Sequence, residues 1–222
     1  MIPYKDDNPT RTFPFVTLGL IAINSLIFLY EVLLGPQTQA FIFELGMIPF
    51  EVTHGVNLPV SPSLPPYLTL LTSMFLHGGW LHLIGNMLYL WIFGDNVEDA
   101  LGHFRFLIFY IVCGLIAAGT HIFSSMDSTI PTVGASGSIA GVLGAYFLLY
   151  PRAHVYTLIP IFFYMEVLVL PASIVLGFWF LLQIFNGIFS WGVNLGGVAW
   201  FAHIGGFIGG YLLMRCYAPK LR

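Results

Sequence analysis

Six apolar stretches occupy most of this 222-residue sequence and constrain its fold more than any other feature. The hydrocarbon core of a bilayer is about 30 Å thick, so a helix that crosses it needs roughly 20 apolar residues. Five stretches can be recognised directly, and the sixth follows a break that the glycines at 78 and 79 predict. The expected spanning helices cover residues 15–34, 80–93, 106–123, 136–150, 172–190 and 196–216.

The scarcity of charge supports this interpretation. Only 8% of the residues are charged and 58% are hydrophobic, whereas a soluble protein carries about 25% charged residues. Too few charges remain to coat a soluble protein of this size, which excludes a cytosolic enzyme and a secreted disulfide scaffold. The net charge of −3 offers no basic surface for nucleic acid. We therefore expect an all-α membrane protein whose surroundings are the lipid bilayer.

The seven Lys and Arg residues predict the orientation of the helices. If the amino terminus is inside and six spans follow, every Lys and Arg falls on the inner side, as the positive-inside rule requires. A seventh span within 153–190 would move the basic residues of the C-terminal end outside, and Glu166 interrupts that segment. Residues 155–170 are therefore expected to form an inner-face or interfacial connection.

The same topology divides the chain into regions. We expect a short cytosolic tail over residues 1–14, a six-helix membrane domain over 15–216 and a cytosolic tail over 217–222. The connection 35–66 would be a long first outer loop, and loops of that length usually have a function. No targeting peptide is recognisable, which favours a prokaryotic plasma membrane.

Polar side chains inside these apolar stretches are the candidate functional residues, because polar groups are costly in lipid. His82 and Asn86 are four residues apart and share one helical face. Asn86 and His203 each lie about 10 Å below the outer surface, at 1.5 Å per residue. Ser136 begins a helix too short to span unless its outer end starts below the surface. The expected topology thus brings the three residues to one depth.

A hydroxyl beside an imidazole is an activated nucleophile. His203 would take the proton of Ser136 as a base and return it to a leaving amine as an acid. The free N–H groups at the helix start, with Asn86 and His82, could stabilise a tetrahedral oxyanion. The glycines at 134 and 137 would let a substrate backbone come close. Because no intramembrane aspartate can orient His203, the expected catalytic unit is a dyad.

Three short motifs resemble those of the rhomboid family. Residues 134–137 match its G-x-S-G motif, residues 82–86 its H-x-x-x-N motif, and residues 202–210 its A-H-x-x-G-x-x-x-G motif. The resemblance implies a rhomboid-like bundle of six transmembrane helices. It also implies a serine endopeptidase, a hydrolase that cuts transmembrane segments of membrane-protein substrates near the outer face.

The resemblance also implies residue roles, which we carry over by position. Ser136 would be the nucleophile and His203 the base, with Asn86 and His82 as oxyanion donors and Gly134 and Gly137 beside the substrate. His77 would be a structural histidine, and Glu98 a structural carboxylate with Arg152 or Arg105 as its partner. Some members carry a tyrosine where this chain has Ala140. The orientation of His203 is therefore open, with an aromatic ring from another helix as a hypothesis.

Three alternatives compete with peptide cleavage. His77, His82 and His203 could supply a metal site, but no H-E-x-x-H motif or acidic ligand accompanies them at this depth. A transporter would use the broken helices, yet no charged residue lies at mid-depth apart from Glu31 near the outer end of the first span, and no repeated halves are apparent. A non-catalytic relative would bind membrane clients without cutting them. We expect no metal or organic cofactor, and the sequence leaves the oligomeric state and the identity of the substrate open.

Overall fold

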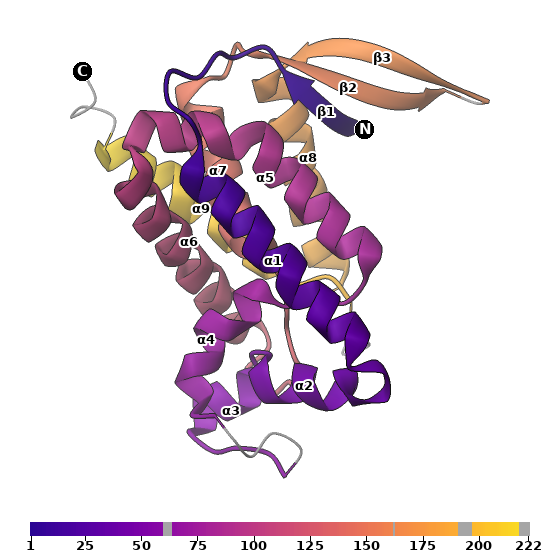
Figure 1. The fold of residues 1–222 in the computed structure, drawn as a ribbon, viewed down its shortest axis with the longest axis vertical. Coiled ribbons are helices and arrows are strands. Elements are labelled where there is room, and N and C mark those ends of the chain that lie inside the picture. The colour runs from indigo at the N-terminus through magenta and orange to yellow at the C-terminus, as the bar shows by residue number, and fades with distance from the viewer. Residues whose placement is uncertain (60–63, 162, 191–196, 218–222) are drawn as a thin grey trace.

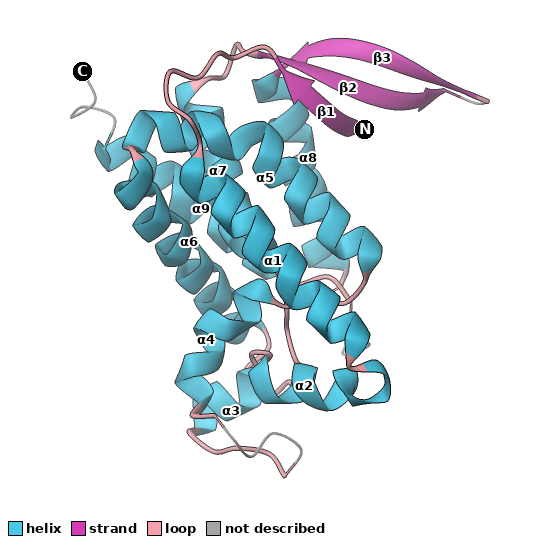
Figure 2. Cartoon of the chain, viewed as in Figure 1, coloured by secondary structure: helices cyan, strands magenta, loops and turns pink. Residues whose placement is uncertain are grey.

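The computed structural model describes residues 1–59, 64–161, 163–190 and 197–217. Long helices form a bundle, with short helices at one end and a small sheet at the other (Figure 1). Figure 2 shows that helix predominates in the described chain. Its long helices are α1 (Phe15–Leu33), α5 (Trp80–Leu101), α6 (His103–Ser124), α7 (Ser136–Leu149), α8 (Ala172–Phe189) and α9 (Trp200–Tyr217). Three of these, α1, α6 and α8, are long and apolar enough to cross a membrane.

Most helix boundaries lie within about four residues of those predicted, but the end of α5 was predicted wrongly. The helix continues eight residues beyond Phe93, to Leu101, so residues 94–101 are not part of a loop. The break comes at Gly102, whose φ of +75° is a left-handed conformation that glycine adopts without strain. The polar residues after Phe93 remain helical because the amino-terminal segment supplies partners for them.

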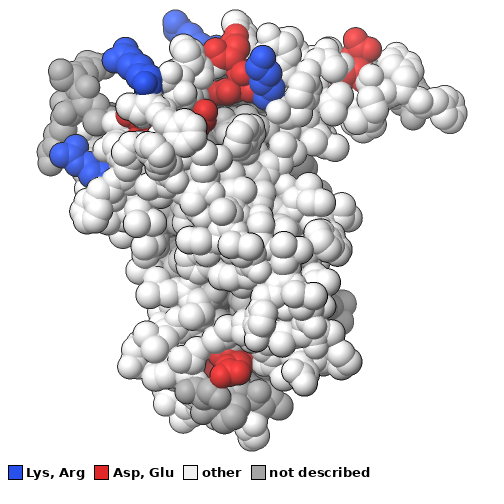
Figure 3. All heavy atoms as spheres, in the orientation of Figure 1, with Lys and Arg blue, Asp and Glu red and all other residues white. Residues whose placement is uncertain are grey.

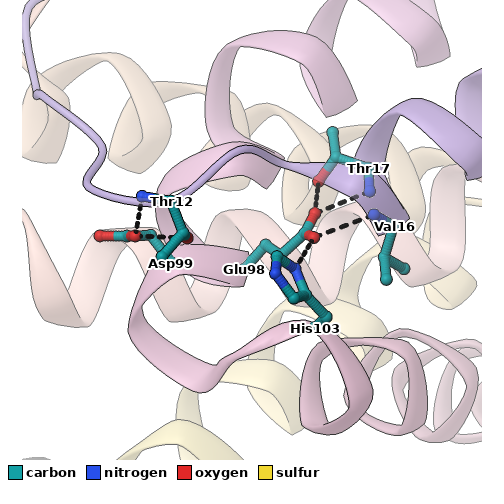
Figure 4. Close-up of polar contacts among 6 residues, drawn as sticks. All are labelled: Thr12, Val16, Thr17, Glu98, Asp99 and His103. Atoms are coloured by element: carbon teal, nitrogen blue, oxygen red, sulfur yellow. Dashed lines mark hydrogen bonds and ion pairs between the residues drawn. The ribbon is translucent and has the colours of Figure 1, made fainter.

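Glu98 holds the start of α1 against the end of α5 (Figure 4). Its buried carboxylate accepts hydrogen bonds from the N–H groups of Val16 and Thr17, at 2.9 and 2.7 Å, and from Thr17 Oγ1 at 2.6 Å. His103 Nδ1 lies 2.5 Å from the same carboxylate. The first N–H groups of a helix have no partner within it, and they favour a negative charge. The predicted partners Arg152 and Arg105 were therefore wrong.

Helix α7 lies at the centre of the bundle, and most of its residues are buried. Glycines let α9 approach it closely: a Cβ atom added at Gly206 would fall on the carbonyl oxygen of Gly137, and one at Gly210 on that of Gly141. Small residues at such crossings allow helix backbones to come close in membrane proteins. This packing brings the first turn of α7 next to the first turns of α9.

The connection predicted as a long outer loop contains two short helices, α2 (Thr38–Leu45) and α3 (Pro49–His54). Beyond it come α4 (Thr69–Thr72) and the 3-10 turns η2 (Pro66–Leu68) and η3 (Ser73–Phe75), while η1 (Gly35–Gln37) precedes α2. Met47 and Thr132 exchange backbone hydrogen bonds of 3.1 and 2.8 Å. The connection is thereby tied to the segment that leads into α7.

The opposite end carries a three-stranded antiparallel sheet in the order β1 (Ile2–Asp6), β2 (His154–Ile161) and β3 (Tyr164–Pro171). Strand β1 pairs Ile2 with Leu158 and Asp6 with Val155. The segment predicted as a connection is thus a β-hairpin formed by β2 and β3. Part of the predicted amino-terminal tail forms β1, the third strand of the sheet. The start of the chain and the end of α9 lie at this same end (Figure 1).

The Lys and Arg side chains are unevenly distributed along the long axis. On the face shown in Figure 3, Lys and Arg side chains gather at the end that carries the sheet, while the sides of the bundle are uncharged. Lys220 and Arg222 also entered that argument, but they lie outside the described residues.

Candidate active site

A cavity of about 890 Å³ opens at the end of the bundle opposite the sheet. It is bounded by the starts of α5, α7 and α9 and by the segment that precedes α7. All six site residues predicted from the sequence line it: His82, Asn86, Gly134, Ser136, Gly137 and His203. The fold therefore brings together three segments that are up to 121 residues apart in sequence, from His82 to His203.

Ser136 and His203 are in hydrogen-bond contact. Ser136 is the first residue of α7, and His203 lies in the first turn of α9. The Oγ atom of Ser136 is 2.8 Å from Nε2 of His203. His203 is buried, with 8% of its surface exposed, so its ring is held by the packing of the surrounding helices.

The other ring nitrogen of His203 contacts Gln183, a residue of α8 that was not predicted. Gln183 Oε1 lies 2.9 Å from His203 Nδ1, and Gln183 Nε2 donates to the carbonyl oxygen of Trp179 at 2.9 Å. Because an amide oxygen only accepts, Nδ1 must carry the ring proton. Nε2 is then free to accept the hydroxyl proton of Ser136. The signal in the sequence was an amide in a largely apolar stretch, which Gln183 shares with Asn186.

An aromatic ring from another helix also lies beside His203, as hypothesised. The centroid of Trp179 on α8 is 5.8 Å from that of His203, with the planes inclined by 34°. Ala140, which occupies the position of the family's tyrosine, is completely buried. Its Cβ atom is 3.2 Å from where a Cβ of Gly206 would be. Ala140 thus lies at the close crossing of α7 and α9.

Two side chains face Ser136 from the α5 side of the cavity. Asn86 Nδ2 is buried and has no hydrogen-bond partner within the described part of the chain. The His82 ring lies against Gly134, where an added Cβ would be 2.8 Å from its Nε2 and 3.5 Å from Ser136 Oγ. His82 Nδ1 accepts from the N–H of Gly78 at 3.4 Å, so Nε2 carries the ring proton. Both side chains line the same cavity as Ser136.

The backbone at Gly134 explains why this position is glycine. Its φ is +130°, a region that L side chains rarely adopt, and its N–H donates to the carbonyl oxygen of Ser73 at 2.9 Å. Two residues later α7 begins, and the first N–H groups of a helix have no helical acceptor. The α7 start thus presents backbone donors beside Ser136.

His77 lies behind His82 and outside the cavity. Its backbone N–H donates to the carboxylate of Glu31, at 3.2 Å to the nearer oxygen, and its ring centroid is 5.2 Å from that of His82. Among the described residues, no three His, Cys, Asp or Glu side chains are placed to hold a metal ion. The three-histidine alternative therefore has no ligand set there.

The fold and the apolar helices define a multi-pass membrane protein with a partly buried serine–histidine pair. The sequence model of the Rhomboid domain matches residues 66–220. Since this covers 155 of 222 residues, the chain belongs to the rhomboid family.

Curated relatives agree with this assignment. The chain is 31% identical over 137 residues to the putative rhomboid protease YdcA of Bacillus subtilis (strain 168), a match that covers 61% of this chain and 62% of the relative. It is 32% identical over 142 residues to the rhomboid protease GluP of the same organism, covering 64% of this chain and 25% of the relative. The chain thus spans less than two thirds of either relative.

Proposed function

We propose that this protein is an intramembrane serine endopeptidase in which Ser136 and His203 form the catalytic dyad. The observation that carries the proposal is the 2.8 Å contact between Ser136 Oγ and His203 Nε2 at a cavity in a rhomboid-family bundle. The intact pair favours cleavage over a role limited to binding membrane clients. The names of the two Bacillus subtilis relatives, both rhomboid proteases, support the same reaction class.

The proposed topology has six spans, formed by α1 and by α5 to α9, with both termini in the cytosol. Helix α7 has 14 residues, so it is about 21 Å long, shorter than the hydrocarbon core of about 30 Å. Ser136 at its outer end then lies below the membrane surface, and the cavity is the route by which water reaches it. The short helices between residues 35 and 72 would cover the outer side. A prokaryotic plasma membrane remains our proposal for the compartment.

The reaction uses the two sides of the cavity separately. Ser136 Oγ attacks the scissile carbonyl carbon while His203 Nε2 takes the hydroxyl proton. The resulting oxyanion accepts hydrogen bonds from Asn86 Nδ2, His82 Nε2–H and the N–H groups at the start of α7. His203 then gives its proton to the leaving amine, and the C–N bond breaks to leave an acyl-enzyme. Water, deprotonated by His203, cleaves the ester and restores the hydroxyl of Ser136.

Gln183 has a positioning role in this scheme. Gln183 Oε1 accepts a hydrogen bond from Nδ1–H and so holds the imidazole in the tautomer that can act as a base. The same hydrogen bond stabilises the imidazolium formed after proton transfer. Its own amide is fixed by the carbonyl oxygen of Trp179. The dyad therefore has a third, neutral member in the place where serine hydrolases commonly use a carboxylate.

The proposed substrates are transmembrane segments of other membrane proteins. A peptide bond within a helix is shielded by its hydrogen bonds, so the segment must unwind locally before Ser136 can attack it. The cavity offers space for an extended backbone beside Gly134, where an L side chain would collide with His82. Small or helix-breaking residues near the scissile bond would favour cleavage.

Covalent labelling tests the proposal directly. The protein in liposomes is treated with a fluorophosphonate, and the modified residue is located by mass spectrometry. We expect an adduct on Ser136, lost in Ser136→Ala and after heat unfolding. Ser138→Ala is the matched control, because Ser138 is buried two residues away and its hydroxyl faces Met74. Labelling that persists in Ser136→Ala, together with undiminished cleavage of a model transmembrane substrate, would refute the assignment.

A further inference from the structure

The outer half of the β2–β3 hairpin is largely apolar on both faces and is not covered by the rest of the described chain. Tyr164, Glu166 and Leu168 lie on one face, because alternate residues of a strand point to the same side. Met165, Val167 and Val169 lie on the other. All of these side chains are exposed, and Phe163 at the turn is fully exposed.

Only the base of the hairpin is packed against the protein. Val155 and Thr157 on β2 are completely buried, and they pair with Leu170 and Leu168 of β3. Beyond that point the two strands continue to Ile161 and Tyr164, past the end of β1, whose last pairing is between Ile2 and Leu158. Figure 1 shows this part of the hairpin reaching sideways beyond the helices.

The composition of the hairpin does not suit exposure to water. An antiparallel sheet with one wet face alternates apolar and polar residues, but from His154 to Pro171 the only carboxylate is Glu166, and there is no Lys or Arg. A docked globular partner would cover one face and leave the other exposed. A medium that surrounds the hairpin explains apolar side chains on both faces and at the tip.

The position of the hairpin identifies that medium. Strand β3 ends at Pro171 and α8 begins at Ala172, so no linker separates the hairpin from a helix apolar enough to cross a membrane. The outward side of α8 is lined by exposed apolar residues such as Ile174, Phe178 and Leu181. The exposed apolar surface of the hairpin therefore continues the lipid-facing surface of the bundle. Tyr156 and Tyr164 have the amphipathic rings that are enriched at membrane interfaces.

We propose that residues 159–160 and 163–169 lie in the interfacial region of the inner leaflet and bind the lipid surface. Eight residues per strand reach about 26 Å at 3.3 Å per residue, of which only the part beyond the packed base would contact lipid. The unpaired edge of β3 still needs hydrogen-bond partners, which the hydrated headgroup layer supplies and the hydrocarbon core does not. The bilayer would thereby hold the inner end of α8, the helix that carries Gln183. The proposal does not depend on peptide cleavage.

Site-directed spin labelling tests this placement. The starting variant is Cys216→Ser, because Cys216 is exposed and Cys113 is buried. Single cysteines then replace Phe163 at the tip, Met165 on β3, or Arg152 as the matched control in the exposed turn before β2. The labelled proteins are placed in vesicles of phosphatidylethanolamine and phosphatidylglycerol. Collision rates are measured with oxygen, which concentrates in lipid, and with a water-soluble nickel chelate.

We expect the ratio of oxygen to nickel collisions to be higher at 163 and 165 than at 152. Adding Val167→Asp and Val169→Asp should lower the ratio at 165 toward that at 152, while amide exchange shows that β2 and β3 remain paired. Equal ratios at 152 and 163 in the starting variant would place the hairpin in water and overturn the proposal. Protection of 163 from both reagents, or spin–spin broadening between copies, would show a protein contact and overturn it equally.

Discussion

Gln183 Oε1 and Ser136 Oγ lie on opposite nitrogens of the same imidazole, at 2.9 Å from Nδ1 and 2.8 Å from Nε2 of His203. The three side chains come from α8, α7 and α9. The hydrogen bond at Nδ1 of the imidazole is therefore supplied by a helix that carries neither Ser136 nor His203.

Removing the acceptor at 183 should impair catalysis without preventing substrate binding. Gln183→Leu keeps the approximate size of the side chain but cannot accept a hydrogen bond from Nδ1–H of His203. We therefore expect kcat to fall about tenfold, which corresponds to the free energy of one hydrogen bond. KM should change little. Gln183→Glu retains an acceptor and should recover most of the lost kcat. A fall in kcat shared equally by the Leu and Glu variants, with matching losses of Tm, would indicate a purely structural role.

Asn86→Ala should lower activity but not stability. Loss of one oxyanion donor typically reduces kcat by about 100-fold or more. The buried Nδ2 atom has no partner in the described structure, and removing an unsatisfied buried donor relieves its desolvation cost. We therefore expect Tm to be unchanged or raised. Asn24→Ala is the control, because Asn24 is also buried but bonds to the carbonyl oxygen of Leu20 in α1; it should leave kcat unchanged. Normal turnover by Asn86→Ala would refute the assignment of Asn86 as an oxyanion donor.

The meeting of the six predicted site residues could be foreseen because depth in a bilayer follows from counting residues along a helix. Ser136, Asn86 and His203 each lie near the start of a helix that enters from the same side, and the glycines of α9 bring two of those helices together. Gln183 could not be foreseen in the same way. It lies on α8 near the opposite end from Ala172, and nothing in its sequence position says which side of the helix faces His203.

The wrong predictions about the fold have a common cause: the residues concerned have partners that are distant in sequence. Helix α5 extends to Leu101 because Glu98 and Asp99 bond to residues 12–17. Strand β1 forms because β2, about 150 residues away, offers an edge. The run 155–170 is apolar without clear periodicity, and such a run does not distinguish a strand from a buried helix segment.

Gly206→Ala should damage both stability and activity. The added Cβ would fall on the carbonyl oxygen of Gly137, which cannot move without shifting the start of α7. Overpacking of this kind typically costs about 1–3 kcal/mol, and the displacement should also break the contact between Ser136 and His203. Gly85→Ala is the matched control in a helix, because no atom lies within 4 Å of its added Cβ. Thermal unfolding in detergent and kcat, measured on both variants, check the prediction; a Gly206→Ala protein as active as Gly85→Ala would contradict it.

Glu98→Gln should destabilise the bundle although it changes few atoms. One carboxylate oxygen becomes an NH₂ group, which cannot accept from the donors of Val16 and Thr17 that surround it. A buried donor left without its acceptor costs about 1–3 kcal/mol. Asp99→Asn is the control, since Asp99 makes exposed hydrogen bonds with Thr12 and should cost less. Equal Tm values for the two variants would show that the buried hydrogen bonds of Glu98 stabilise the protein no more than the exposed ones of Asp99.

Docking of strand β1 should depend on pH through Asp7. Hydrogen bonds from the side chain and the backbone of His154 lower the pKa of Asp7 below its ordinary value of 3.8. A lowered pKa means that the ionised form favours the docked strand, so this contribution is present above pH 4 and is lost as the pH falls through the lowered value. Asp6 acts in the opposite direction, because burial raises its pKa. Amide exchange of residues 2 and 4–6, corrected for intrinsic rates, should therefore accelerate more on acidification in the wild type than in Asp7→Asn. Identical pH profiles for the two proteins would show that the contact between Asp7 and His154 does not hold the strand.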